Sequence, residues 1–164
     1  MKVVFLDLDG VMNSGWYARD RRNYVVKEQG NIFKEIDPQA IKVLNDFCKE
    51  TDAKIVISSS WRTTAYADNV LERAGFKGKV IGITPHIEGK YVLRGNEIYA
   101  WIKQNINLLE VDYSSNFKQY VIFDDDGDML YWQRHHFFQT DTISGLTPNI
   151  AYRAKRFLLS QKNL

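Results

Sequence analysis

The chain contains few residues of the kinds that mark secreted or multidomain proteins. Its 164 residues include one cysteine and three prolines. The single cysteine, Cys48, cannot form an internal disulfide bond, which suits a reducing compartment, so we expect a cytoplasmic location. Cys48 lies in an apolar helical stripe, where it is expected to fill the core. Because no proline-rich or low-complexity run divides the chain, we expect a single domain over residues 1–164.

Long apolar runs and a strong net charge are also missing. No stretch of 18 apolar residues is present and the first residues show no signal-peptide pattern, so we expect no membrane partner. The net charge of +2 is too small to indicate a nucleic-acid partner by itself. A hydrophobic content of 45% and a charged content of 26% are average for a globular domain that buries a core.

Short apolar runs alternate along the chain with segments of helical spacing. Residues 3–8 hold five apolar side chains in six positions, which is typical of a buried strand. Further strands are expected at 53–60, 79–84, 119–123 and 136–139, and helices at 37–50, 63–74, 94–106, 129–133 and from 147 onward. Strands that alternate with helices form a parallel sheet covered on both faces. The sequence therefore predicts a Rossmann-like, three-layer α/β/α fold with five parallel strands.

One segment, at about 13–36, does not fit this alternation. It is polar and aromatic, and we expect a loop or a small β-flap beside the end of the first strand. Trp16, Tyr17 and Tyr24 accompany the sequence ARDRR at 18–22. These side chains could stack on bases and meet backbone phosphates, and a solvated flap packed on its own aromatic residues is an equal alternative.

Polar residues follow three of the expected strands. They are Asp7 and Asp9 after the first strand, the serines at 58–60 with Arg62 after the second, and Asp124 and Asp125 after the fourth. The carboxyl ends of parallel strands lie at one edge of the sheet, so these groups should converge. Carboxylates without nearby cysteine or histidine suit Mg²⁺, and hydroxyl and guanidinium donors suit phosphate. The set predicts metal-assisted phosphoryl transfer.

Each of these features has a simpler explanation when it is taken alone. An aspartate after a strand often forms a turn, and serines often cap the following helix. The strings DLDG and DDDGD are similar to calcium loops, but Val11 occupies the third ligand position and no glutamate closes the loop. The separate explanations do not account for the occurrence of all these groups at the ends of buried strands.

Three strings resemble the motifs of a known superfamily. FLDLDGVMN is similar to motif I of the haloacid dehalogenase superfamily, IVISSSWR to motif II, and VIFDDDGDM to motif IV. The resemblance covers nearly the whole chain. SSSWR, RGNEI and GLTP are similar to the phosphatase-like domains associated with RNA-repair proteins, and the phosphatase domain of polynucleotide kinase-phosphatases is a further relative. The resemblance implies the fold of that superfamily with a minimal cap or none.

The resemblance also implies roles for individual residues. Asp7 would be the nucleophile that forms an aspartyl-phosphate, and Asp9 the general acid and base. Mg²⁺ would be held by Asp7, the backbone carbonyl of Asp9, Asp124 and Asp125. The residues expected to bind phosphate or substrate are Gly10, Ser59, Ser60 and Arg62. Of the two serines, Ser59 is the better match to the motif II hydroxyl and Ser60 is its close competitor.

Motif III departs from the pattern, because arginine stands where a lysine is usual. Arg94 keeps the positive charge, and its position at the start of a helix, where a cation is unfavourable, indicates another purpose. Lys90 and Lys103 are the alternatives. Asp128 either supports the metal site or caps the short helix that follows it.

The predicted function is hydrolysis of phosphomonoesters with Mg²⁺, on polynucleotide or nucleotide phosphate ends. The alternatives are a catalytically silent binding subunit of a nucleic-acid repair complex, and a small-molecule or phosphoprotein phosphatase. Asp9 argues against a dehalogenase, which needs no such general acid. The serines at 58–60 occupy the place where a receiver domain has its phosphorylated aspartate, so a receiver is excluded.

Overall fold

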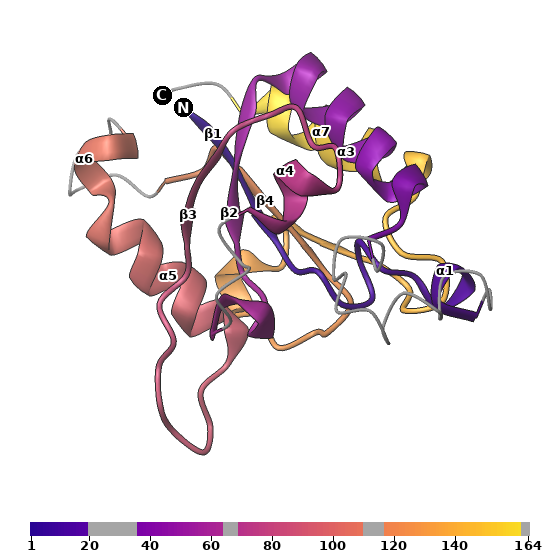
Figure 1. Cartoon of the computed structure of the whole chain (residues 1–164). Helices are drawn as coiled ribbons and strands as arrows, with labels where there is room; N and C mark the ends of the chain where they lie inside the picture. The colour runs from indigo at the N-terminus through magenta and orange to yellow at the C-terminus, as the bar shows by residue number, and fades with distance from the viewer. Residues whose placement is uncertain (20–35, 64–68, 110–116, 162–164) are drawn as a thin grey trace.

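A five-stranded parallel sheet forms the centre of the protein (Figure 1). The computed structural model describes residues 1–19, 36–63, 69–109 and 117–161. Within them the strands are β1 (Lys2–Leu6), β2 (Ala53–Ile57), β3 (Val80–Ile83), β4 (Tyr120–Asp124) and β5 (Phe137–Gln139). Their order is β3-β2-β1-β4-β5, and each neighbouring pair is parallel. The strand that carries Asp7 at its end is therefore the central one.

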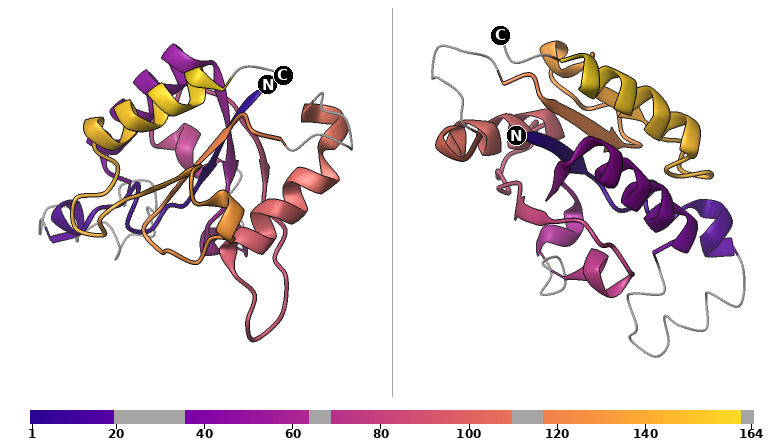
Figure 2. Two further views of the ribbon diagram at one scale, coloured as in Figure 1. Left: turned by 180° about the vertical axis from the view of Figure 1, so that it is seen from behind. Right: turned by 90° about the horizontal axis from the view of Figure 1, so that it is seen from above.

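Helices cover both faces of this sheet (Figure 2). One face carries α3 (Pro38–Thr51), α4 (Val70–Arg73) and α7 (Pro148–Ser160), and the other carries α5 (Arg94–Gln104) and α6 (Ile106–Leu109). The predicted three-layer, Rossmann-like fold with five parallel strands is confirmed. None of the helices in the described ranges is long and apolar enough to cross a membrane.

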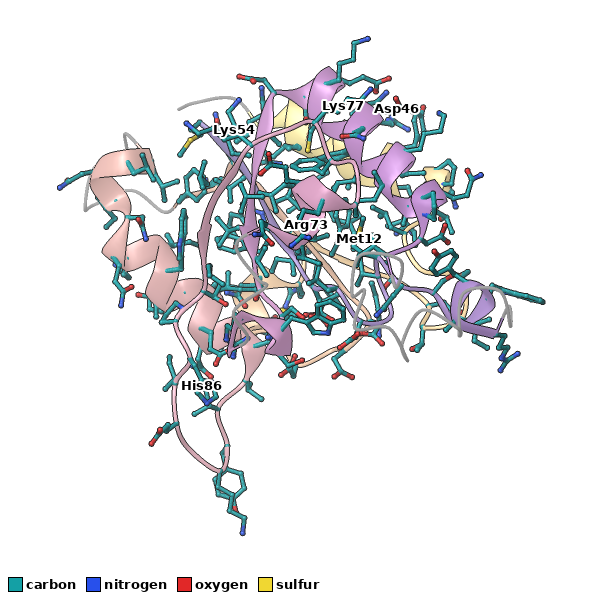
Figure 3. The ribbon with its side chains drawn as sticks, viewed as in Figure 1. Met12, Asp46, Lys54, Arg73, Lys77 and His86 are labelled. Atoms are coloured by element: carbon teal, nitrogen blue, oxygen red, sulfur yellow. The ribbon has the colours of Figure 1, made fainter. Side chains whose placement is uncertain are left out.

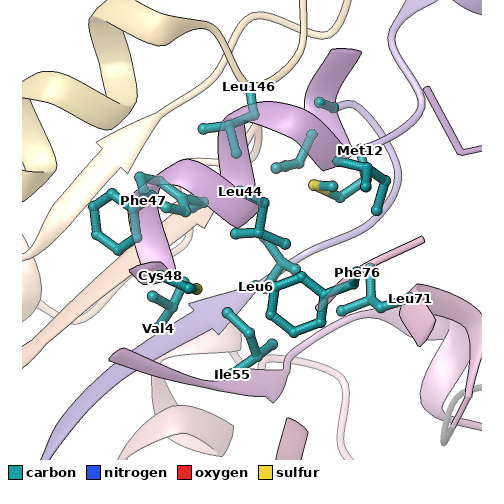
Figure 4. Packing of buried hydrophobic residues seen from close by; sticks show 14 of the residues in the cluster. Val4, Leu6, Met12, Leu44, Phe47, Cys48, Ile55, Leu71, Phe76 and Leu146 are labelled. Atoms are coloured by element: carbon teal, nitrogen blue, oxygen red, sulfur yellow. The ribbon is translucent and has the colours of Figure 1, made fainter. Parts of the chain in front are cut away.

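The side chains of β1 alternate between two apolar clusters. Val4 and Leu6 pack in the cluster under α3, which also holds Leu44 (Figure 4). Phe5 points to the opposite face and meets Trp101 of α5 edge to face, with ring centroids 5.5 Å apart. Because successive strand residues point to opposite faces, this alternation buries β1 on both sides. The central strand is thereby fixed between two helical layers.

The predicted helix starts at two prolines are confirmed. Asp37 caps α3 by accepting a hydrogen bond from the Gln39 amide at 2.8 Å, and Thr147 caps α7 in the same way. Cys48 lies buried on the inner side of α3, and burial raises the pKa of its thiol to about 12. The expectation that Cys48 fills the core is also confirmed.

Part of the segment at 13–36 is helical, and the expected loop or β-flap is wrong for residues 15–19. Gly15–Arg19 forms α1. The hydroxyl of Ser14 accepts the amide of Tyr17 at 3.2 Å, and the Ser14 carbonyl accepts the amide of Ala18. Ser14 is thus a helix cap that the aromatic surroundings obscured. Residues 20–35, with Tyr24 and most of the ARDRR string, lie outside the described residues.

Three expected helices differ from the observed ones in their bounds. The helix expected at 63–74 is preceded by a 3₁₀ turn, η3 (Ser60–Thr63), and α4 begins only at Val70. Residues 64–68 lie outside the described part. The helix expected at 94–106 is interrupted at Asn105, whose side-chain amide donates to the Trp101 carbonyl at 2.8 Å and so competes with the helix. The helix expected at 129–133 is the 3₁₀ turn η4 (Tyr131–Gln133).

Candidate active site

Three carboxylates meet where β1 and β4 end. Asp7 follows β1, and its amide donates to the carbonyl of Phe123 at 2.9 Å, which joins the ends of the two strands. Asp124 is the last residue of β4, and Asp125 follows it. One carboxylate oxygen from each aspartate lies within 4.8 Å of the others. The structure thus brings together the three side chains that the sequence predicts as metal ligands.

These carboxylates are short of compensating charge. Burial raises the pKa of Asp7 to about 6, although a hydrogen bond from Ser59 and the charge of Arg94 act in the opposite direction. Burial, together with the nearby Asp7, raises the pKa of Asp124 to about 8. Atom Oδ2 of Asp124 is buried and has no hydrogen-bond partner among the described residues. A divalent cation fits this all-oxygen set, and Mg²⁺ is the cation that such ligands usually hold.

Gly10 allows the third carboxylate to come close. Its backbone has a φ of +68°, which disfavours other residues, and a Cβ there would overlap the carboxylate of Asp125. The Gly10 amide donates to Oδ1 of Asn13 at 2.9 Å. Gly10 was predicted as a phosphate contact. In the structure its amide is engaged within the turn, and its missing side chain makes room for Asp125.

Asp9 is exposed and lies beyond the end of the strand. β1 ends at Leu6, so Asp7 is buried while Asp9 is exposed. Oδ2 of Asp9 accepts the indole N–H of Trp61 at 2.8 Å, and Oδ1 accepts the side-chain amide of Asn13 at 2.6 Å. Neither Trp61 nor Asn13 was predicted as a site residue. Both stand inside the motif-like strings, SSSWR and DGVMN, which is the signal that could have found them.

The structure separates the two candidate serines of motif II. Ser59 is fully buried, and its hydroxyl forms a hydrogen bond to Asp7. Ser60 is exposed and is the first residue of η3. A hydroxyl that faces the buried carboxylate is placed to hold a phosphate oxygen there. The geometry therefore favours Ser59.

Of the three candidate cations, Arg94 is the one that lies at the carboxylates. Its Nη2 is 3.8 Å from Oδ1 of Asp7, and its Nε is 3.5 Å from Oδ2 of Asp124. Lys90 is exposed and lies over the ring of Tyr91, and the ammonium of Lys103 lies over Tyr99.

Asp128 caps the helix that carries Arg94. Its Oδ2 accepts the Arg94 amide at 2.8 Å. The expectation that it caps the helix that follows is wrong, because the residue before η4 is Leu130, which forms no side-chain cap. An acid at the amino terminus of α5 offsets the unfavourable position of the Arg94 cation.

Arg62 is held by a residue that sequence reasoning missed. Its Nη2 lies 2.6 and 2.7 Å from the two carboxylate oxygens of Glu97, and its Nη1 donates to the carbonyl of Ser59 at 2.9 Å. The guanidinium of Arg62 is turned to these partners, and its predicted phosphate contact stays a prediction. Glu97 is three residues after Arg94 on α5, a spacing that places two side chains on one face of a helix. That spacing could have indicated Glu97.

The fold and the residues at its edge define an α/β domain with an acidic site at the carboxyl ends of its central strands. A family model described as "HAD domain in Swiss Army Knife RNA repair proteins" matches residues 3–151, and the chain belongs to this family of the haloacid dehalogenase superfamily. Neither a comparison with curated proteins nor one with solved structures gave a match.

Proposed function

We propose that this domain is a Mg²⁺-dependent phosphatase that hydrolyses phosphomonoesters through a phosphorylated Asp7. The observation that carries the proposal is the meeting of Asp7, Asp124 and Asp125 within 4.8 Å, beside Arg94. Bound Mg²⁺ would neutralise the repulsion between a carboxylate nucleophile and an anionic phosphate. Asp7, Asp124 and Asp125 would hold it, with the carbonyl of Asp9 as the fourth expected ligand.

The reaction then proceeds in two displacements. A carboxylate oxygen of Asp7 attacks phosphorus, and the bond to the leaving oxygen breaks while Asp9 protonates that oxygen. Asp9 next takes a proton from water, whose oxygen attacks phosphorus and releases inorganic phosphate and free Asp7. Arg94 and the Ser59 hydroxyl are placed to hold phosphate oxygens. Both oxygens of Asp9 accept hydrogen bonds, from Trp61 and Asn13, and these bonds orient its carboxylate.

The direct test is hydrolysis of an aryl phosphate in Mg²⁺ by the protein and by Asp7→Asn. We expect the substitution to lower kcat by on the order of 10³-fold or more, because no nucleophile remains, and a chelator to abolish the wild-type activity. Asp126→Asn is the matched control, since Asp126 is an exposed acid in the same run and should leave activity unchanged. Activity that survives in Asp7→Asn or in chelator would contradict the mechanism. Mg²⁺ binding without turnover of any substrate would indicate a catalytically silent binding domain.

A polynucleotide end is the substrate that the surroundings of the site favour. Tyr131 and Trp132 of η4 expose 75% and 58% of their surface, and the guanidinium of Arg134 lies 3.9 Å above the Tyr131 ring. Exposed aromatic rings beside cations are typical platforms for unpaired bases. Gln133 of the same turn donates to the carbonyl of Gly95, the residue after Arg94, at 3.0 Å. The exposed rings of η4 therefore lie beside the helix end that carries Arg94.

Two tryptophan variants separate this surface from the one on α1. We expect Trp132→Ala to raise KM for a phosphorylated oligonucleotide about 10-fold, through the loss of one stacked base, and to leave KM for an aryl phosphate unchanged. Trp16→Ala removes another exposed ring, from α1, and should not change either KM. If Trp16→Ala raises KM for the oligonucleotide and Trp132→Ala does not, the oligonucleotide binds at α1 and not at η4. The oligonucleotides are tested with 3′ and with 5′ terminal phosphates. If they are hydrolysed no faster than sugar phosphates and phosphopeptides, the preference for polynucleotides is rejected.

A further inference from the structure

Three segments of the chain meet at the buried carboxylate of Glu97, whose side chain is 6% exposed. Arg62 comes from η3, and the amide of Ile87, from the segment between β3 and α5, donates to Oε1 at 3.2 Å. His86, which Figure 3 shows on the same segment, places Nδ1 3.4 Å from Oε1. Nη1 of Arg94 lies 3.8 Å from Oε2. One carboxylate thus joins the turn after β2, the segment after β3 and the start of α5.

The charges around Glu97 form an alternating series. A buried carboxylate needs a charged partner and further hydrogen bonds to offset its desolvation. Glu97 obtains these from Arg62, which is 8% exposed, and from the Ile87 amide. Glu97 therefore does not need Arg94 as its main partner, and the positive charge of Arg94 also interacts with Asp7 and Asp124. The series runs from the acidic site through Arg94 and Glu97 to Arg62.

We propose that Glu97 is a positioning residue for the phosphatase reaction, and this inference rests on the proposed function. Glu97 holds Arg62, which in turn fixes the backbone of Ser59 through the bond from Nη1 to the Ser59 carbonyl. The Ser59 hydroxyl meets Asp7. Glu97 also gives Arg94 a third carboxylate, on its own helix, which would hold the guanidinium at the site if Mg²⁺ were bound by Asp7 and Asp124.

This arrangement gives Arg62 a different role from the one that the family resemblance implies. Both of its terminal nitrogens are engaged by Glu97 and Ser59, and its Nε is buried without a hydrogen-bond partner among the described residues. Arg62 therefore acts through Ser59 and not on the phosphate itself.

A double-mutant cycle tests the proposal. Glu97→Gln, Arg62→Met and the double variant are assayed on an aryl phosphate in Mg²⁺. We expect each single variant to lower kcat by about 10- to 100-fold, as small displacements of catalytic groups do, with KM changed less than about threefold. The double variant should lose no more than the worse single variant, because both changes remove the same link. Glu50→Gln, which breaks the pair between the exposed Glu50 and Lys155, is the control and should change neither constant.

A conservative variant separates positioning from packing. Glu97→Asp keeps the charge and loses volume, whereas Glu97→Gln keeps the volume and loses the charge. We expect Glu97→Asp to retain more kcat than Glu97→Gln. The reverse order would show that Glu97 only fills space, and this would overturn the proposal.

Two other outcomes would also overturn it. In the first, Arg62→Met leaves kcat unchanged but raises both KM and the inhibition constant of inorganic phosphate at least 10-fold. That result would show that Arg62 binds the phosphate directly. Multiplicative losses in the double variant would show that Glu97 and Arg62 act separately. A wild-type protein without turnover would reject the proposed function instead. The midpoint of thermal unfolding would then be measured for the same variants. If the shift in the double variant equals the sum of the shifts in the single variants, the pairing of Glu97 with Arg62 is rejected.

Discussion

Two buried groups of charge lie at the same edge of the sheet and differ in how completely they are paired. The carboxylate cluster of Asp7, Asp124 and Asp125 has one nearby cation, Arg94, and a buried oxygen of Asp124 without a hydrogen-bond partner among the described residues. Glu97, by contrast, has two bonds from Arg62 and one from a backbone amide.

The difference in pairing separates Glu97, which positions neighbouring side chains, from the carboxylate cluster, which is suited to bind a cation. A fully paired buried carboxylate gains little from a further cation, and its partners fix its position. An underpaired cluster, in which burial raises the pKa values of Asp7 and Asp124, gains most from a divalent cation. The same edge of the sheet therefore contains a fully paired carboxylate, Glu97, and an underpaired cation-binding cluster, and Arg94 contacts both.

The largest effect on the carboxylate cluster alone is expected from Gly10→Ala. The added Cβ would displace the carboxylate of Asp125 and would strain a backbone with positive φ. We expect a loss of Mg²⁺ affinity of about 100-fold and a loss of about 1–2 kcal/mol in the free energy of unfolding. Titration of Mg²⁺ against activity and thermal unfolding measure the two effects. Gly127→Ala is the control, because a Cβ there meets nothing within 4 Å. Equal behaviour of the two variants would remove Gly10 from the site.

The second prediction concerns the pH dependence of stability without metal. Folding raises the pKa of Asp7 to about 6 and that of Asp124 to about 8, so the folded state binds more protons than the unfolded state between pH 4 and 8. Stability is therefore greatest below about pH 4 as far as these two groups are concerned, and it is lost as the pH rises through their folded values. Because a pKa difference of one between the folded and unfolded states corresponds to about 1.4 kcal/mol, we expect the two groups together to lower the free energy of unfolding by several kcal/mol.

Mg²⁺ should reverse this loss, because it binds the deprotonated cluster. The upward shift of the unfolding midpoint on adding Mg²⁺ should be larger at pH 8 than at pH 5. In Asp124→Asn both the pH dependence and the Mg²⁺ shift should shrink. A Mg²⁺ shift that is independent of pH would show that the raised pKa values do not belong to the metal-binding groups.

The smallest effect is expected from a hydrogen bond that orients the cluster. The hydroxyl of Thr142 donates to Oδ2 of Asp125 at 2.9 Å. We expect Thr142→Val to weaken Mg²⁺ binding by about 10-fold and to leave the unfolding midpoint nearly unchanged, because Thr142 is exposed. Thr142→Ser keeps the hydroxyl and should bind Mg²⁺ normally. If Val and Ser variants bind alike, Asp125 needs no orienting partner.

The two groups also differ in how far the sequence could predict them. Asp7, Asp124 and Asp125 follow buried strands, and the carboxyl ends of parallel strands must meet at one edge, so their convergence follows from the apolar pattern. The contact of Glu97 with Arg62 joins residues that are 35 positions apart. It depends on the rotation of α5 about its axis and on the 3₁₀ turn after β2, neither of which the apolar pattern determines.

Other differences have the same origin in local polar contacts. The start of α1 depends on one serine cap within an aromatic segment, and the cap of α5 by Asp128 joins residues that are 34 positions apart. Hydrophobic periodicity reports which face of an element is buried, but it does not report which polar side chain closes an end. The sheet and its acidic edge were therefore predictable, and the polar supports around that edge were not.

The bond from the Asp7 amide to the Phe123 carbonyl has a consequence for the timescale of motion at the site. On the other side of β1, the amide of Ser58 donates to the carbonyl of Leu6 at 2.8 Å. The backbone at Asp7 is thus pinned to both neighbouring strands, and its displacement requires the centre of the sheet to open. Such openings are as rare as global unfolding. Adjustment to a substrate therefore falls to side-chain rotation at Asp9 and Arg94, which is faster by many orders of magnitude than any opening of the sheet.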